Sequence, residues 1–295
     1  MAIHYLSRPN PLRAVNGIQP PSHASSNPGE ISGVLELKVR TIARRGVSPS
    51  TGKFSLEGDG QLPVLACARR AGVPVIPGTG IKGAIRTYFE MLTRACVLFS
   101  EGNRPTCKSS KACPACALFG CLGLQGRISF SDAVPVAEDA VEVTIAKVFP
   151  AWEPKGRPGG EFRIYDHFPA IGDPHRPAPE KIGREVYLGT FRTRLWFRNL
   201  EPGEFGRLLA AMGLSPDLSS RFFPRLGGAK YDGFGAVEVK PHGLRLMPPQ
   251  RQTLEGQACR AKCREWLSAA FDSDWATVAA PILTALAQYH GGDTP

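Results

Sequence analysis

IPGTGIKGAIRTYFE, residues 76–90, is the stretch of sequence that says most about the fold. Its proline and first two glycines favour a turn, and apolar residues then recur at helical spacing from Ile81 to Leu92. The stretch therefore predicts a glycine-rich turn that opens a helix, with Lys82 and Arg86 on the first turns of that helix.

Alternating apolar residues predict strands on both sides of this helix. The stretch ISGVLELKVRTIA, from Ile31, and the stretch GRISFSDAVPV, which includes Arg127, alternate residue by residue. GREVYLGTFRTRLWFRNL alternates again, and PGEFGRLLAAMGL after it has helical periodicity. The order strand, helix, strand, hairpin, strand, helix and strand predicts an α+β fold with an RRM-like (ferredoxin-like) core that carries large insertions.

Changes in composition along the chain predict one main domain with additions. Residues 1–29 are rich in Pro, Ser and Asn, so we expect an irregular N-terminal arm. Residues 30–245 hold the core, interrupted by a cysteine-bearing lid at about 96–121 and by a thumb β-hairpin at about 137–190. Residues 250–295 carry two amphipathic patterns, which predict a C-terminal helical appendage.

Composition and charge limit the classes of function. The chain has 295 residues, of which 42% are hydrophobic, and this content excludes general disorder. Its formal net charge of +10 suggests a polyanionic partner such as nucleic acid. No apolar run reaches the ~18 residues that a membrane helix needs. The first residues lack an apolar stretch followed by a small-residue cleavage site, so we expect a cytoplasmic protein.

The cysteines carry the most specific chemistry. Cys113 and Cys116 form a C-x-x-C knuckle, whose gap lets both sulfurs meet one tetrahedral ion, and Cys107 lies just before them. These three are the predicted ligands of a structural zinc ion, with Cys96 or Cys121 as the fourth. Four protein ligands leave no place for a catalytic water, so the ion would order a loop.

The alternatives to a zinc site are buried core thiols or an incidental redox pair. Buried structural thiols are expected at the three remaining positions, Cys67, Cys259 and Cys263.

The predicted turn at the start of the helix is a candidate anion site. Free backbone N–H groups near Gly78 and Gly80, together with Lys82 and Arg86, could hold a phosphate of a nucleic-acid backbone. The alternative is a tight turn with two solvated cations. The spacing is not that of a Walker loop, which argues against ATP binding.

A second glycine cluster, LGGAKYDGFGAVEV, offers similar chemistry. Gly227 and Gly228 allow close backbone approach, while Lys230 and Tyr231 are available for phosphate contact and base stacking. A single glycine-rich loop is weak support, but two such loops in one basic chain reinforce each other.

The thumb segment interleaves aromatic residues with cations, among them Trp152 and Arg163. Single-stranded RNA is bound in this way, because rings stack on bases and cations follow the phosphates. The alternative is a hairpin that packs its rings on the body of the protein.

The sequence offers little for catalysis. Cleavage of RNA needs a general base, usually His, or acidic ligands for a divalent ion such as Mg²⁺. Asp59, in the loop EGDGQ, is the candidate for an acidic group. An isolated loop Asp is usually a surface residue.

Three motifs together resemble a known family. IPGTGIKGAIRTYFE, CPACALFG running into GRISFSDA, and LGGAKYDGFGAVEV resemble the RAMP superfamily of CRISPR-associated proteins. The resemblance is strongest to the crRNA-binding backbone subunits of type III effector complexes. It covers about residues 31–240 and leaves the tail uncovered.

The resemblance implies an RRM-like core, a zinc-stabilised lid and a thumb hairpin, with many copies assembled along a guide RNA. Lys82 and Arg86 would hold guide phosphates, and the thumb would part the guide–target duplex at intervals in antiviral defence. Family members that cut target RNA carry Asp in a D-x-P pattern where this chain has Gln61. Asp59 lies two residues earlier, and the departure puts cleavage in doubt.

Three hypotheses follow. The first is a crRNA-binding subunit of a type III-like ribonucleoprotein, whose partners are guide RNA, target RNA and other effector subunits, including copies or paralogues of itself. The second is an endoribonuclease of the same superfamily, acting on target RNA or precursor crRNA. The third is a zinc-bearing adaptor that contacts other proteins through its C-terminal helices.

Overall fold

The structure is a computed structural model in which part of the chain is described. The described residues are 3–7, 29–42, 46–55, 64–96, 107, 111–137, 140–148, 161–165 and 182–290.

The architecture is α+β, as predicted, and is built on a nine-stranded sheet. The order along the sheet is β15-β14-β2-β13-β4-β3, and β9, β10 and β11 also pair with β13. The strands of this sheet are β2 (Ile31–Thr41), β3 (Ser50–Ser55), β4 (Val64–Cys67), β9 (Ile128–Phe130), β10 (Val134–Pro135), β11 (Val141–Val148), β13 (Ile182–Leu200), β14 (Val237–Leu246) and β15 (Thr253–Glu255).

Short two-stranded sheets and helices complete the described chain. The remaining strands are β1 (Ile3–Ser7), β5 (Arg69–Arg70), β6 (Val73–Pro74), β7 (Gly120–Cys121), β8 (Leu124–Gln125) and β12 (Glu161–Tyr165). The helices are α1 (Gly78–Leu92), α2 (Pro114–Phe119), α3 (Pro202–Ala211), α4 (Gly256–Phe271) and α5 (Trp275–His290), with a 3-10 turn at Lys230–Asp232. Among the described helices, none combines the length and the apolar character needed to cross a membrane.

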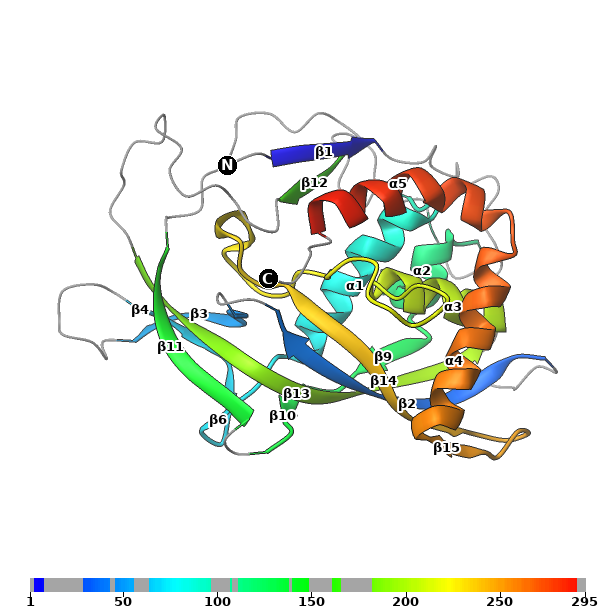
Figure 1. Ribbon diagram of the computed structural model, residues 1–295, viewed down its shortest axis with the longest axis horizontal. Helices are drawn as coiled ribbons and strands as arrows, with labels where there is room; N and C mark the ends of the chain where they lie inside the picture. The colour runs from blue at the N-terminus through cyan, green and yellow to red at the C-terminus, as the bar shows by residue number, and fades with distance from the viewer. Residues whose placement is uncertain are drawn as a thin grey trace.

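The helices lie on one side of β2, β13 and β14 and leave the opposite face open (Figure 1). Alternation along the strands explains this arrangement, because successive side chains point to opposite faces of a sheet. On β13, Leu195 and Phe197 are buried, whereas Arg194, Trp196 and Arg198 are exposed. One face of the sheet therefore closes the core, and the other exposes Trp196 among charged side chains, of which Arg194 pairs with Glu36 and Arg40 with Glu238.

The two C-terminal helices belong to the core, which differs from the predicted appendage. Trp266 of α4 packs against Phe205 of α3, with ring centroids 4.7 Å apart, and Trp275 of α5 donates from Nε1 to the carbonyl oxygen of Leu92 at 2.7 Å. Their apolar faces require burial, and each large side chain buried in this way contributes about 1.5–3 kcal/mol. The helices therefore complete the helical layer over the sheet.

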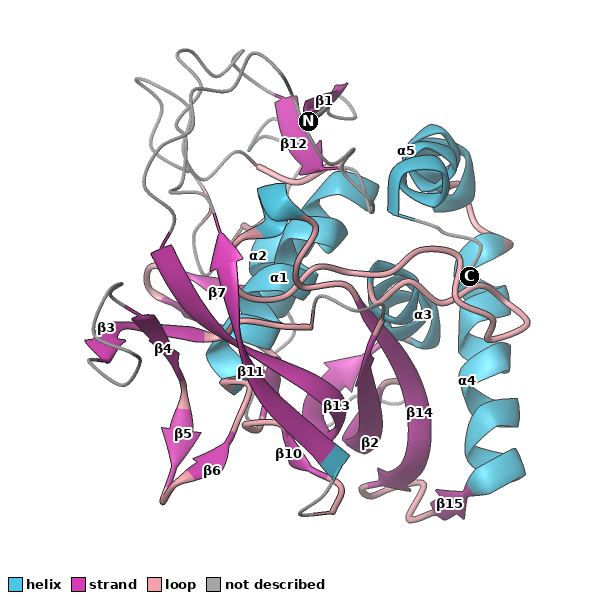
Figure 2. Ribbon diagram, turned by 60° about the vertical axis from the view of Figure 1, so that its left-hand side comes forward, coloured by secondary structure: helices cyan, strands magenta, loops and turns pink. Residues whose placement is uncertain are grey.

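The strand pairing of the thumb segment also differs from the prediction. β11 pairs antiparallel with the first half of β13, from Val141 opposite Gly189 to Val148 opposite Ile182. The stretch KGRPGGEF favours a turn that would pair β12 with β11, but β12 instead pairs with β1 in the N-terminal segment that was expected to be irregular. The long β13 is the partner of β11, because its first half extends past the end of its pairing with β2 at Thr190. This extension projects away from the helices (Figure 2).

Candidate functional site

Four cysteines converge beside α1. The thiols of Cys96, Cys107, Cys113 and Cys116 all lie within 4.8 Å of one another, and the sulfurs of Cys96 and Cys116 are 3.6 Å apart. A tetrahedral ion with ligand distances of about 2.3 Å would hold its sulfurs roughly 3.8 Å apart. The cluster therefore fits a metal ion such as zinc. Cys121 lies outside the group, so the geometry favours Cys96 over Cys121 as the fourth ligand.

The short helix α2 arranges two of these thiols. Cys113 is its N-cap, and the sulfur accepts a hydrogen bond from the backbone N–H of Cys116 at 3.4 Å. The backbone N–H of Cys113 in turn donates to the sulfur of Cys107 at 3.3 Å. Hydrogen bonds from Cys116 and Cys96 lower the pKa of Cys113, which favours the thiolate that a metal needs. The donor set is that of a closed structural site.

Arg86 lies against this cluster and not against solvent. Its guanidinium donates to Glu90 Oε1 at 2.7 Å, to the carbonyl oxygen of Gly120 at 2.7 Å and to the sulfur of Cys116 at 3.5 Å. The side chain is 18% exposed. Because protein groups use these donors, the placement argues against the predicted phosphate contact and gives Arg86 a role in fixing the cysteine segment to α1.

The start of α1 is also occupied by the protein itself. The backbone N–H of Gly78 donates to Asp132 Oδ1 at 2.9 Å. A Cβ on Gly78 would lie 2.2 Å from the carbonyl oxygen of Phe130, so the glycine is needed for close packing on β9. Gly80 is exposed with open space around it. The predicted anion site at this helix terminus thus already holds a carboxylate.

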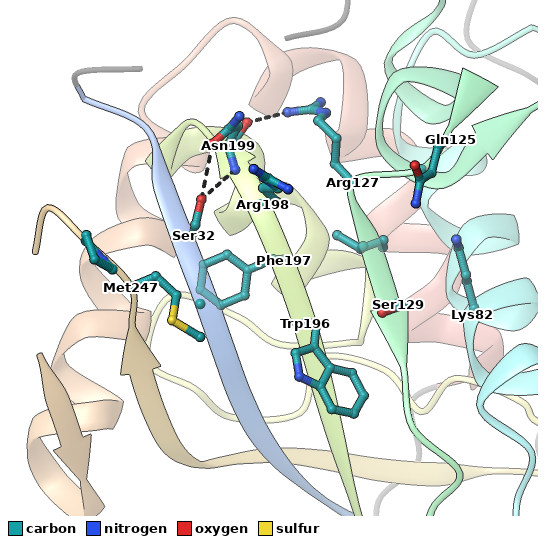
Figure 3. Close-up of a pocket in the computed structure, with 14 residues that line it drawn as sticks. Ser32, Lys82, Gln125, Arg127, Ser129, Trp196, Phe197, Arg198, Asn199 and Met247 are labelled. Carbon is teal, nitrogen blue, oxygen red and sulfur yellow. Dashed lines mark hydrogen bonds between the residues drawn. The ribbon is translucent and has the colours of Figure 1, made fainter. Parts of the chain in front are cut away.

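Lys82 instead faces a groove of about 580 Å³ on the open side of the sheet (Figure 3). Burial lowers the pKa of Lys82, and the nearby Arg86 lowers it further. Among the described residues that line the groove, no side chain carries a carboxylate. The lining residues are Ser32, Gly33, Lys82, Gln125, Gly126, Arg127, Ile128, Ser129, Trp196, Phe197, Arg198, Asn199, Met247 and Pro248.

A β-bulge and a buried arginine build the floor of this groove. The register between β13 and β2 shifts between Phe197 and Leu200, and Asn199 has a φ of 51°. The Ser32 hydroxyl accepts from the backbone N–H of Asn199 at 2.9 Å. Arg127 donates from Nη1 to the carbonyl oxygen of Asn199 at 2.7 Å and to Glu204 Oε2 at 2.8 Å. The neighbouring Arg198 is left exposed beside the groove.

The second glycine cluster brings the backbone close to the chain itself. Gly227 has a φ of 77°, and a Cβ there would lie 2.4 Å from the carbonyl oxygen of Ser48. A Cβ on Gly228 would lie 2.4 Å from a guanidinium nitrogen of Arg184. Internal packing against the backbone therefore explains Gly227, whereas the contact of Gly228 is with the flexible end of a side chain and does not require glycine.

Lys230 and Tyr231, next to these glycines, are each partly exposed. Burial lowers the pKa of Lys230, and the buried Arg225 lowers it further. An anion bound at this loop would raise the pKa of Lys230 again, because an opposite charge favours the ammonium form.

Several predicted site residues are not placed by the structure. Asp59, Gln61 and Trp152 lie outside the described residues. Arg163 is in β12, but its side chain is not described.

Sequence reasoning missed the open face of the sheet. Trp196 is 40% exposed there, and Arg198 lines the groove beside it. The pattern RTRLWFRNL held the signal, because its cations and Trp196 occupy alternate positions opposite the buried residues. Only the register shows that Ser129, Val34 and Arg245 join Trp196 in one row across the sheet.

Comparison with known proteins bears on the family. In the structure described as "Cryo-EM structure of the Type III-B Cmr-beta bound to cognate target RNA", one chain is 16% identical to this one, with a TM-score of 0.41. The match covers 74% of this chain and 61% of that chain. No curated protein matches this chain. The family model of the RAMP superfamily matches residues 68–238, which is more than half of the sequence. The chain belongs to the RAMP superfamily, as its three motifs predicted.

Proposed function

We propose that the chain is a guide-RNA-binding subunit of a type III CRISPR effector, with an RRM-like core that grips the phosphates of the guide. Membership of the RAMP superfamily supports this proposal, as do the three motifs that resemble the crRNA-binding subunits. In antiviral defence its partners would be guide RNA, target RNA and other subunits of the effector. The β11–β13 extension would be the thumb that spaces the guide–target duplex.

The observation that carries the proposal is the groove beside Lys82. It is lined by cations and by hydrogen-bond donors such as Ser129 and Gln125, with no carboxylate among its described lining residues. Such a groove attracts a polyanion by charge and does not read its sequence. Lys82 on α1 and Arg198 on β13 both line the groove, so each would bind a phosphate of the strand (Figure 3).

Fluorescence anisotropy with the full chain and a labelled single-stranded RNA tests this proposal. Lys82→Gln combined with Arg198→Gln should weaken binding about equally for all sequences. The slope of log K against log salt should flatten by about 1.4, because each single-strand phosphate contributes about 0.7. Lys262→Gln removes a charge on α4, where the lysine pairs with Glu265, and should leave the slope almost unchanged. An unchanged slope in the double variant would contradict the phosphate role.

Zinc is the metal that we propose for the cysteine cluster. Four thiols at these separations match tetrahedral zinc, and cysteine is the ligand that such structural sites use most. Elemental analysis of the purified chain should show about one equivalent of zinc. Iron or copper in place of zinc would reject this assignment and keep the ligand set.

A further inference from the structure

The open face of the sheet has a second hollow, of about 320 Å³, on the other side of Trp196 from the groove. Trp196 and Met247 line both hollows and therefore form the wall between them. The second hollow is lined by Val34, Glu36, Arg194, Trp196, Gly243, Leu244, Arg245, Met247, Thr253, Leu254 and Glu255.

The two hollows differ in charge. The groove carries cations without a carboxylate among its described residues, which suits a phosphate. The second hollow balances Arg194 and Arg245 with Glu36 and Glu255, which suits a neutral group that both donates and accepts hydrogen bonds. Arg194 Nε donates to Glu36 Oε1 at 3.2 Å, so this pair holds its charges together at the edge of the hollow.

The ring between the hollows is a flat apolar platform. The side chain of Trp196 is 40% exposed, although tryptophan usually buries its large apolar surface in a core. It stands on β13 opposite Ser129 of β9 and Val34 of β2, both small enough to leave the ring uncovered. An aromatic platform, a neutral polar hollow and an adjacent cationic groove together match one nucleotide of a single strand, with its base, base edge and phosphate.

We propose that one unpaired base of single-stranded RNA stacks on Trp196 and turns its edge toward Glu36 and Arg194, while the adjoining phosphates lie along Lys82 and Arg198. This inference rests on the proposed function and deepens it. The phosphate groove alone would hold any polyanion, whereas Trp196 adds a contact that requires a base. A duplex cannot make this contact, because its bases are stacked and paired.

Two RNA probes and the full chain separate the contributions. One is a short single-stranded oligouridylate, and the other is the same ribose-phosphate chain without bases. Trp196→Ala should weaken binding of the oligouridylate about tenfold and leave the salt slope unchanged, since stacking is not ionic. Both proteins should bind the abasic chain equally. Trp196→Phe should retain most of the affinity, and Phe54→Ala, which removes an exposed ring on β3, should change nothing.

A second readout does not depend on the folding of the Ala variant. Oligouridylate should quench part of the tryptophan emission of the wild-type chain, the abasic chain should not, and Trp196→Phe should remove that quenching. Equal binding of oligouridylate by wild type and Trp196→Ala, with unchanged quenching in Trp196→Phe, would overturn the stacking site and leave the proposed function intact. A wild-type chain that binds neither probe at low salt would overturn both.

Discussion

Lys82 and Arg86 lie one helical turn apart on α1 and reach two different regions of the molecule. Lys82 lines the groove on the open face of the sheet, and Arg86 donates to Glu90, Gly120 and Cys116 beside the cysteine cluster. The motif that contains them predicted that both residues hold phosphates. Lys82 is left facing the groove, whereas the donors of Arg86 are used by groups of the protein itself.

The two regions also differ in how the chain builds them. The four cysteines lie between positions 96 and 116, so a short segment supplies the cluster. The groove takes residues from Ser32 to Pro248 and exists only because β2, β9, β13 and β14 are aligned in a particular register. A local cluster is therefore visible as a spacing, whereas a sheet-face site depends on strand pairing. Substitutions that disable one region should therefore leave the other intact.

The largest effect is expected from the cysteine cluster. Cys116→Ser, or chelation of the wild-type chain, should reduce bound metal to a small fraction of an equivalent. It should also expose α2, which Cys113 caps, to limited proteolysis, because ligand binding supplies the order of such sites. Elemental analysis and protease digestion measure the two results. Cys121→Ser is the matched control, since this thiol lies outside the cluster and should keep the metal. A full equivalent of metal in Cys116→Ser would reject the ligand set.

A smaller effect is expected from Arg127, which joins the two regions. Its Nε donates to the carbonyl oxygen of Ala117 in α2 at 3.0 Å, and its Nη1 to that of Asn199 at the groove. The side chain is 2% exposed and pairs with Glu204. Arg127→Met should lower the free energy of unfolding by about 3 kcal/mol, because it leaves the Glu204 carboxylate buried without its partner. Urea denaturation measures this.

The double variant tests the cause of that loss. Arg127→Met with Glu204→Leu should recover part of the stability, since no buried charge remains. A double variant less stable than Arg127→Met would show that lost packing, and not the unpaired carboxylate, explains the effect.

Arg86→Gln should weaken metal binding by about tenfold, as loss of a partner around metal ligands commonly does. The guanidinium donates to the sulfur of Cys116 and to the carbonyl oxygen of Gly120, and Gln cannot reproduce both bonds. Competition with a chromogenic chelator gives the affinity. The salt slope of RNA binding should stay at its wild-type value, and a fall equal to that of Lys82→Gln would place Arg86 at the groove after all.

The smallest effect is expected from the titration of Lys82. Burial lowers the pKa of this ammonium group below the ordinary lysine range near ~10.4, so the charge that attracts phosphate is lost at a lower pH than for a solvated lysine. RNA affinity should therefore decrease by a few-fold as the pH rises toward that range. Lys82→Arg stays charged and should remove this part of the pH dependence. Equal pH profiles for wild type and Lys82→Arg would show that Lys82 does not contribute.

Local patterns predicted much of the fold. The helix after the glycine turn, the strand from Ile31 and the α+β class all follow from periodicity, because side chains repeat over short distances in helices and strands. Pairing was harder to predict. The sequence pattern of β12 would allow it to pair with β11 or with β1. Only the tertiary structure shows that β12 pairs with β1 and that β11 pairs with β13. The C-terminal helices likewise looked separable until Trp266 was placed against Phe205.

The sequence by itself determined the family, the excess of cations and the cysteine spacing, since each is a matter of which residues occur near one another along the chain. Only the tertiary structure decided which cations are free. It set Arg86 on the cysteine cluster, placed Asp132 at the start of α1 and brought Trp196, Lys82 and Arg198 together around one groove. The physical reason is that a charge or a ring is available to a ligand only where packing leaves its polar atoms or its face unused, and packing joins residues far apart in sequence.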